Sequence, residues 1–93
     1  MLEVDLSFDL SPNYDMEAYG DWARHSAGIM KRQPGVLEFR GHRNIFGTPR
    51  IQTSSVWRGA DDWSNFIQST AWLSIGSELR SFASNLMVNL KGH

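Results

Sequence analysis

The chain opens with a strict alternation of apolar and polar residues. Positions 2, 4, 6, 8 and 10 are apolar, and Glu3, Asp5, Ser7 and Asp9 lie between them. Successive side chains of a β-strand point to opposite faces of the sheet. The segment 2–10 is therefore predicted to be a strand with one face on a core and the other face polar.

A helical spacing follows this strand. Ser11 suits the N-cap of a helix and Pro12 suits its first turn. Gln33 marks the end, because the residue before a proline disfavours helical geometry. These signals predict an amphipathic helix over 12–32. Its apolar and small residues, spaced three and four apart, are Tyr19, Trp22, Ala23, Ser26, Ile29 and Met30.

Two more strands are predicted in the middle of the chain, over 36–43 and 50–58. The stretch 44–49 between them carries Gly47 and Pro49 as turn markers. The two strands are close in sequence and divided by a turn, so they are expected to pair as an antiparallel hairpin. On the first of them, Leu37 and Phe39 share one face, and the other face carries Glu38, Arg40 and His42.

The C-terminal third predicts a helix and a final strand. Asp61 or Asp62 is the expected N-cap, and a break is expected near Ser69. The helix is then predicted to continue to about residue 85, and the segment 86–91 to form the last strand. The helical stripe comprises Trp63, Phe66, Ile67, Trp72, Ile75, Leu79, Phe82, Ala83 and Leu86.

The resulting order, β-α-β-β-α-β over residues 1–93, predicts an α+β fold of the ferredoxin-like type. We expect a single domain, with a four-stranded antiparallel sheet and both helices on one of its faces. The other sheet face, with Glu3, Asp5, Glu38 and Arg40, is too polar for the core of a monomer.

Composition excludes several classes of function. The chain has no cysteine, which removes disulfides, thiolate nucleophiles and cysteine metal sites. Its net charge of −1, with scattered basic residues, argues against nucleic-acid binding. No apolar run approaches the roughly 18 residues that span a bilayer, and the N-terminus is not a signal peptide. We therefore expect a cytoplasmic protein. We also expect no metal, since no cysteine and no H-x-H or H-x-x-x-H spacing occurs.

Aromatic residues are the most unusual feature of the composition. Four Trp, five Phe and two Tyr are many for 93 residues, because each large ring buries roughly 150–250 Å². Some should line a pocket or an interface. Flat aromatic walls suit a flat aromatic ligand, although core and interface packing is the better explanation for any one of these rings, and the two explanations are balanced only for the group. The candidate substrate-binding residues are Trp22, Trp57, Trp63, Phe66 and Trp72.

His25, Arg40 and His42 are the candidate catalytic residues. His25 lies at the edge of the apolar stripe of the first helix, where it could act as a general base or simply form a local hydrogen bond. Glu38 and His42 are about 13 Å apart along a strand, too far to share a metal. Arg40 between them could bind an anionic ligand or belong to a row of salt bridges.

The segment PGVLEFRGHRN…GTPRIQTSSVWRGADDWSNFIQSTAW resembles the antibiotic biosynthesis monooxygenase type of dimeric α+β barrel. The similar features are the Pro-Gly turn before the second strand, the tryptophan that ends the third, and the F-x-x-S that follows. The resemblance covers residues 2–90. It implies a homodimer in which two polar sheet faces meet.

The resemblance also implies an activity. Related proteins oxidise polyketide-like phenols without metal or flavin, so the function it implies is a cofactor-independent monooxygenase acting on an aromatic or polycyclic small molecule. Haem breakdown is disfavoured, because Gly76 stands where haem-degrading relatives place a histidine. The alternatives are a non-catalytic dimer that binds a small molecule or is purely structural, and a domain that feeds an electron or substrate to a partner enzyme.

Overall fold

The computed structural model describes residues 1–43 and 50–92, and the side chains of all of these except His42 and Arg43. The predicted turn over 44–49 lies outside the described residues. The elements are β1 (Leu2–Leu10), α1 (Met16–Lys31), β2 (Val36–Arg43), β3 (Arg50–Trp57), α2 (Ala60–Ile67), α3 (Thr70–Leu79) and β4 (Ala83–Gly92).

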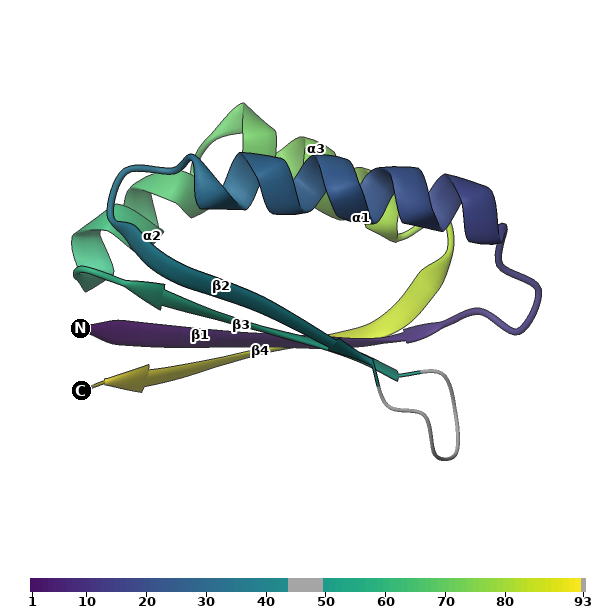
Figure 1. Ribbon diagram of the computed structural model, residues 1–93, viewed down its shortest axis with the longest axis horizontal. Helices are drawn as coiled ribbons and strands as arrows, with labels where there is room; N and C mark the ends of the chain where they lie inside the picture. Colours follow the sequence, from purple (N-terminus) through teal and green to yellow (C-terminus); the bar gives the residue numbers. More distant parts are fainter. Residues whose placement is uncertain (44–49, 93) are drawn as a thin grey trace.

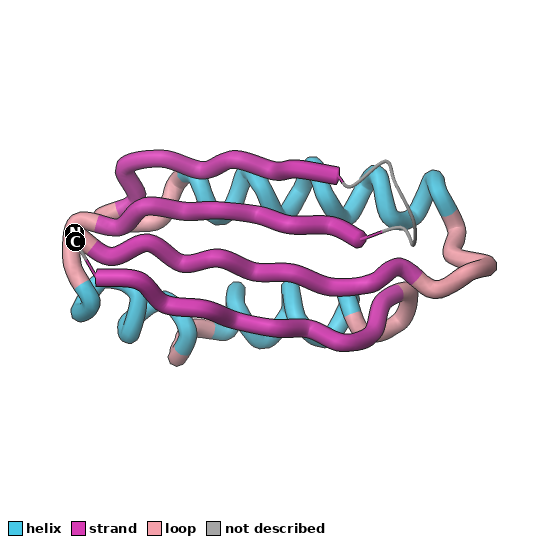
Figure 2. The backbone as a smooth tube through the Cα atoms, turned by 90° about the horizontal axis from the view of Figure 1, so that it is seen from below, coloured by secondary structure: helices cyan, strands magenta, loops and turns pink. Residues whose placement is uncertain are grey.

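The strands form one four-stranded antiparallel sheet in the order β2-β3-β1-β4. All the helices lie over one face of this sheet, and no helix covers the opposite face in the described part of the chain (Figures 1 and 2). The two ends of the chain lie next to each other at one end of the sheet. This arrangement confirms the predicted ferredoxin-like α+β fold and the β2–β3 hairpin.

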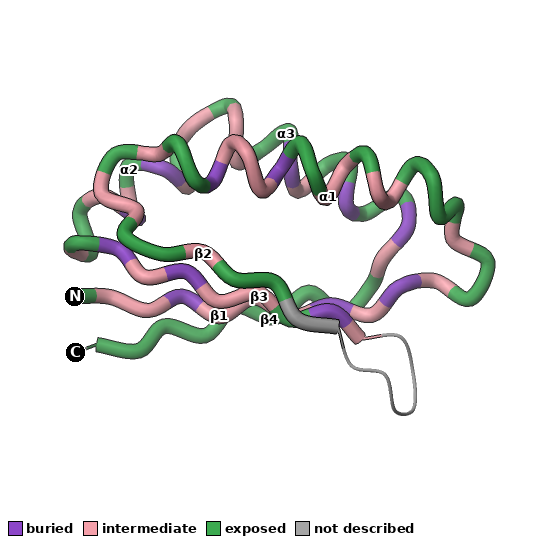
Figure 3. The backbone as a smooth tube through the Cα atoms, in the orientation of Figure 1, coloured by how far each residue is buried: buried purple, intermediate pink, exposed green. Residues whose placement is uncertain are grey.

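The register of the sheet explains the alternation of β1. Val4 lies opposite Ser55 of β3 and Leu90 of β4, and its side chain is fully buried under the helices. Asp5, on the other face, lies opposite Ser54 and Asn89. One face of β1 therefore forms the floor of the core, and the polar positions form the open face. Buried stretches of β1 are separated by half-buried ones along the strand (Figure 3).

The core consists of two clusters of buried residues along the layer between helices and sheet. One contains Trp57, Trp63 and Phe66. The other contains Phe8, Leu79 and Phe82. Trp22 of α1 packs against both clusters and so joins them.

The prediction for the start of α1 is wrong by four residues. The helix begins at Met16, and Asp15 is its N-cap. The Asp15 carboxylate accepts hydrogen bonds from the backbone N–H groups of Glu17 and Ala18 at 3.0 and 3.1 Å. Before it, the Tyr14 N–H donates to the Ser11 carbonyl at 3.1 Å and closes a turn. A carboxylate that satisfies two free N–H groups is a stronger start than the Ser-Pro pair.

The predicted N-cap of α2 is also wrong. Gly59 occupies the cap and forms no side-chain hydrogen bond there. Asp61 and Asp62 instead lie in the first turn, where a negative charge favours the positive end of the helix. The predicted break is confirmed, because the Ser69 hydroxyl caps α3 by accepting from the Trp72 N–H at 3.3 Å.

The C-terminal boundary of the last helix was predicted too late. Helix α3 ends at Leu79, and β4 begins at Ala83, which pairs with Leu10. Phe82 is buried in the turn between them, with 9% of its surface exposed. An apolar residue at helical spacing is therefore part of the core without being helical. Pairing with β1 overrides the local helical pattern here.

Candidate functional site

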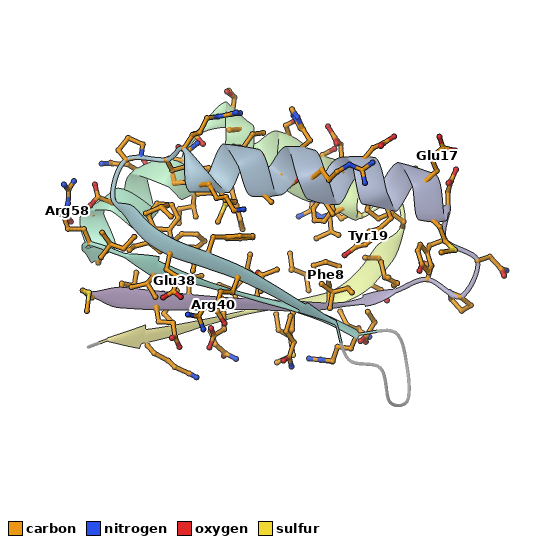
Figure 4. All side chains as sticks on the ribbon, in the orientation of Figure 1. Phe8, Glu17, Tyr19, Glu38, Arg40 and Arg58 are labelled. Carbon is orange, nitrogen blue, oxygen red and sulfur yellow. The ribbon has the colours of Figure 1, made fainter. Side chains whose placement is uncertain are left out.

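A large cavity lies between α1 and the sheet. Its volume is about 460 Å³. Phe8 and Tyr19 lie on its two sides, Phe8 on β1 and Tyr19 on α1, and in Figure 4 they extend toward each other between the layers. The remaining apolar walls come from α1, β2 and β3. They are Trp22, Ala23, Ala27, Phe39 and Ile51.

Small residues keep this cavity open. Ala23 and Ala27 are the alanines of α1 that line it, and Gly41 lines it from β2. A Cβ atom at Gly41 would meet no atom within 4 Å. A helix packs closely on a sheet only where side chains fill the space between them. At Ala23 and Ala27 the helix contributes only methyl groups, and Gly41 of β2 contributes no side chain, so space remains between the two layers at these positions.

A second, smaller cavity of about 50 Å³ has part of its lining in common with the first. It extends under α3 to Trp72, Ile75 and Leu79. The common lining marks the junction of the two cavities and comprises Phe8, Trp22, Ser26, Phe39 and Thr53.

The indole ring of Trp22 is held in place as a wall of both cavities. Its Nε1 donates a hydrogen bond to the backbone carbonyl of Ile75 at 3.1 Å. Its ring meets Phe8 edge-on with centroids 5.9 Å apart, and Phe82 edge-on at 5.7 Å. These contacts fix one wall before any ligand enters, which favours binding because less side-chain entropy is lost.

Few polar groups line the larger cavity. Tyr19, Ser26 and Thr53 are the hydroxyl-bearing residues of its lining. Arg24 and Lys31 contribute cations from exposed positions on α1, and Arg24 is paired with Asp21 at 2.5 Å. No carboxylate or imidazole is among the described lining residues. The site can therefore bind an apolar molecule and meet an anionic group at its edge.

The structure divides the predicted substrate-binding aromatics among three places. Trp22 lines the large cavity, and Trp72 lines the small one. Trp57, Trp63 and Phe66 lie together at the other end of the layer and are buried. Trp57 meets Trp63 with centroids 5.4 Å apart, and Trp63 meets Trp72 at 5.4 Å. This cluster packs α2 against the sheet, away from the larger cavity.

The three predicted catalytic residues do not come together at the cavity. His25 is exposed and lines a separate hollow between α1 and α3, beside Asp21 and Glu78. Arg40 is exposed on the open face of the sheet and forms an ion pair with Glu38 (Figure 4). His42 lies in β2 opposite Gln52, and its side chain lies outside the described ones. Among the described residues, no three His, Asp or Glu side chains are grouped so as to hold a metal ion.

The open sheet face carries its own charge network. Lys91 of β4 pairs with Asp5 at 3.1 Å and with Glu3 at 3.8 Å. Burial raises the pKa of the Asp5 carboxyl, but the hydrogen bonds from Lys91 and Ser54 and the charge of Lys91 outweigh it and leave the pKa below its ordinary value. The same partners raise the pKa of Lys91. Both groups are therefore charged at neutral pH.

Sequence reasoning missed the small residues that make the cavity. Ala23, Ser26 and Ala27 are ordinary residues for a helix that packs on a sheet. Gly41 on its own indicates only a position that weakens the strand. Their common signal is that small residues on two elements face each other once the hairpin and helix are placed. That signal depends on the three-dimensional arrangement, because each residue alone is ordinary.

No helix in residues 1–43 and 50–92 is long and apolar enough to cross a bilayer.

Comparison with known proteins places the fold. No family model and no curated protein matches the sequence. The structure is similar to SnoaB, a cofactor-independent oxygenase from Streptomyces nogalater, with a TM-score of 0.84 and 15% identity over 99% of this chain and 91% of SnoaB. A Nitrosomonas europaea protein, provisionally named an antibiotic biosynthesis monooxygenase, gives 0.85 and 13% identity over 100% and 98% of the two chains.

A third similar structure is described as a dimer. It is a dimeric protein of unknown function and ferredoxin-like fold from Bacteroides fragilis, with a TM-score of 0.75 and 12% identity over 99% of this chain and 95% of the other. At such low identities the likeness concerns the backbone. The chain therefore has a ferredoxin-like α+β fold that is similar to the folds of SnoaB and of the Nitrosomonas europaea protein.

Proposed function

We propose that the protein binds a flat aromatic small molecule in the cavity under α1 and oxidises it with dioxygen, without a metal or an organic cofactor. The observation that carries this proposal is the cavity of about 460 Å³ with walls formed by Phe8, Tyr19, Trp22 and Phe39. Its ring-lined interior fits a planar apolar ligand. The fold similarity to SnoaB, a cofactor-independent oxygenase, supports the reaction class.

The reaction needs only the substrate's own electrons. An electron-rich anthrone loses a C–H proton to give an enolate, and the enolate carbon forms a bond to dioxygen. The resulting peroxide takes up a proton and loses water to give the quinone. One anthrone and one dioxygen thus give one anthraquinone and one water, and no outside reductant is consumed.

The protein would act by positioning and by excluding water. Trp22 and Phe39 would hold the ring plane, and Trp72 would limit how far it enters. The proton would leave to water at the mouth, since no acid or imidazole is among the described lining residues. His25 and Arg40, which lie outside the cavity, have no catalytic part in this proposal.

An oxygen electrode tests the activity. Anthrone is added to the protein in the presence of a metal chelator and without flavin, and the rate is compared with that of heat-unfolded protein at the same concentration. Oxygen uptake above this background, with anthraquinone formed in equal amount, supports the proposal. A rate equal to the background, or one restored only by added metal or flavin, contradicts it.

A non-catalytic binding protein is the second candidate. It is favoured by the absence of a carboxylate or imidazole from the described cavity walls, because a general base commonly assists such oxidations. Saturable binding of an anthrone without oxygen uptake would support this candidate over the enzyme.

We also propose a homodimer formed through the open face of the sheet. This face is polar but not flat: Glu3, Glu38 and Val56 surround a hollow of about 150 Å³. A second copy could fill this hollow and cover the charges, and the similar Bacteroides fragilis protein is dimeric. We expect such a dimer to work in the cytoplasm.

Light scattering after size exclusion tests the assembly. The expected mass is about twice the 10.6 kDa of the chain. Val56→Arg places a new charge in the open face and should shift the protein to monomer. Leu73→Arg, at an exposed position of α3, is the control and should leave the dimer intact. A wild-type monomer at micromolar concentration contradicts the proposal.

A further inference from the structure

Ser26 has a buried hydroxyl with no hydrogen-bond partner. It lies in the middle of α1 and is 6% exposed. Its Oγ is the one buried side-chain oxygen or nitrogen of the described residues that is left without a partner. A serine inside a helix commonly bonds back to the carbonyl four residues earlier, but this hydroxyl does not. Such a group weakens the folded state unless something else satisfies it.

The position of Ser26 indicates what that partner is. Ser26 lines both cavities and so lies at their junction. Thr53 of β3 lines the same junction from the sheet, so a hydroxyl-bearing residue of each layer borders one region. The other residues of the junction are the aromatic side chains Phe8, Trp22 and Phe39. A ring held by these walls would bring a substituent on its edge to the two hydroxyls.

We propose that Ser26 is the hydrogen-bonding subsite of the cavity and selects aromatic ligands that carry a hydroxyl or carbonyl group on the buried edge of the ring. A serine hydroxyl both donates and accepts, so either group can pair with it. This inference rests on the proposed binding function and specifies the ligand class of the same site. It makes Ser26 a specificity-determining residue.

The test uses two probes of nearly equal size, naphthalene and 2-naphthol, and two proteins, the wild type and Ser26→Ala. Binding is measured by calorimetric titration below the solubility limit of each probe. The substitution should weaken 2-naphthol binding about fivefold, the net effect of one hydrogen bond. Naphthalene binding should be unchanged or slightly tighter, because it offers no partner to the hydroxyl.

Thermal unfolding without ligand provides a second measurement. Removal of an unsatisfied buried hydroxyl should raise the melting temperature by about 4–8 °C. Alanine also has a higher helix propensity than serine. The matched control for this effect is Ser74→Ala, at an exposed position of α3. The gain at position 26 should exceed the gain at position 74.

The outcomes separate this inference from the function on which it rests. If both probes bind the wild type and Ser26→Ala affects them equally, the subsite is overturned and the binding cavity stands. A melting temperature lowered by Ser26→Ala also overturns it, because the hydroxyl would then be satisfied within the protein. If neither probe binds the wild type, the binding cavity itself is overturned, and the subsite with it.

Discussion

The indole Nε1 of Trp22 donates a hydrogen bond to the carbonyl oxygen of Ile75 at 3.1 Å and so ties α1 to α3 above the sheet. The bond joins positions 53 residues apart in sequence. It also fixes the orientation of the ring that forms a wall of both cavities. One contact thus connects the packing of the helices to the shape of the site.

Trp22→Phe tests this connection. Phenylalanine keeps an aromatic ring but cannot donate to Ile75, whose carbonyl would lose its side-chain partner. We expect the free energy of unfolding in urea to fall by about 1–2 kcal/mol. 2-Naphthol should also bind more weakly. An unchanged free energy of unfolding would show that the hydrogen bond from Trp22 to the Ile75 carbonyl does not stabilise the fold, because water takes its place.

Trp22→Leu and Trp63→Leu form a matched pair that separates the cavity wall from the packing cluster. Trp63 is 6% exposed and contacts other aromatic rings. Both substitutions remove a large ring, so each should lower the free energy of unfolding by about 2–4 kcal/mol. Only Trp22→Leu should weaken 2-naphthol binding to the fraction that remains folded. Weaker binding in Trp63→Leu would restore Trp63 to the site predicted from the sequence.

Gly41→Val should block the cavity without harming the fold. The new side chain would lie on the same sheet face as Thr53, the partner of Gly41 in β3, in space where no atom stands within 4 Å of its Cβ. Valine is favoured over glycine in strands, so the melting temperature should stay the same or rise. 2-Naphthol binding should weaken by about tenfold, as expected when a methyl group or more intrudes on a pocket.

Gln52→Val is the control for this cavity-filling variant. Gln52 lies on β3 and is exposed on the opposite, open face of the sheet. It should bind 2-naphthol as the wild type does. If both valine variants bind normally, the probe occupies a different site and the cavity under α1 loses its assignment.

The fold could be predicted from the sequence because each helix and strand buries one of its faces. In β1, alternation is readable because Val4 and Phe8 face the helices while Asp5 faces away. The end of α3 was not readable, since Phe82 continues the helical spacing from inside a turn. The aromatic ring of Phe82 indicates correctly that this position is buried in the core. Its backbone conformation, however, is determined by the pairing of β4 with β1, which begins at the next residue.

The candidate site was only partly predictable for a different reason. Large aromatic residues are easy to recognise in a sequence, and Trp22 is predicted to bind a ligand for that reason. The cavity, however, depends on the small size of the side chains at Ala27 and Gly41, and the unpaired hydroxyl of Ser26 is evident only from the three-dimensional structure. The cavity is bounded by residues of several helices and strands. It becomes visible only after the helix and the hairpin are placed over one another.

Gly35→Ala tests the turn that leads from α1 into β2. Gly35 has a φ of 89°, a conformation that side chains other than glycine disfavour. An added methyl would overlap the carboxyl group of Asp62, which pairs with Arg58 at 3.2 Å. We expect a loss of about 1–3 kcal/mol in the free energy of unfolding. Gly92→Ala, where a Cβ meets nothing within 4 Å, should change it by less than about 0.5 kcal/mol.

Lys91→Met should alter how stability depends on pH. The pKa of Asp5 is lowered in the folded state, so its contribution is complete above the ordinary value of 3.8 and disappears as the pH falls through the lower, folded-state pKa. The pKa of Lys91 is raised, so its contribution is lost only as the pH rises beyond 10.5. The wild type should therefore melt slightly higher than Lys91→Met between these limits.

Melting curves from pH 2 to pH 8 provide the measurement. The difference between the two proteins should be constant from about pH 5 to pH 8 and should shrink below about pH 4. Added salt should reduce it, because both side chains are partly exposed. A difference that instead grew on acidification would mean that Asp5 is destabilised as a carboxylate, and the assigned effect of Lys91 on its pKa would be wrong.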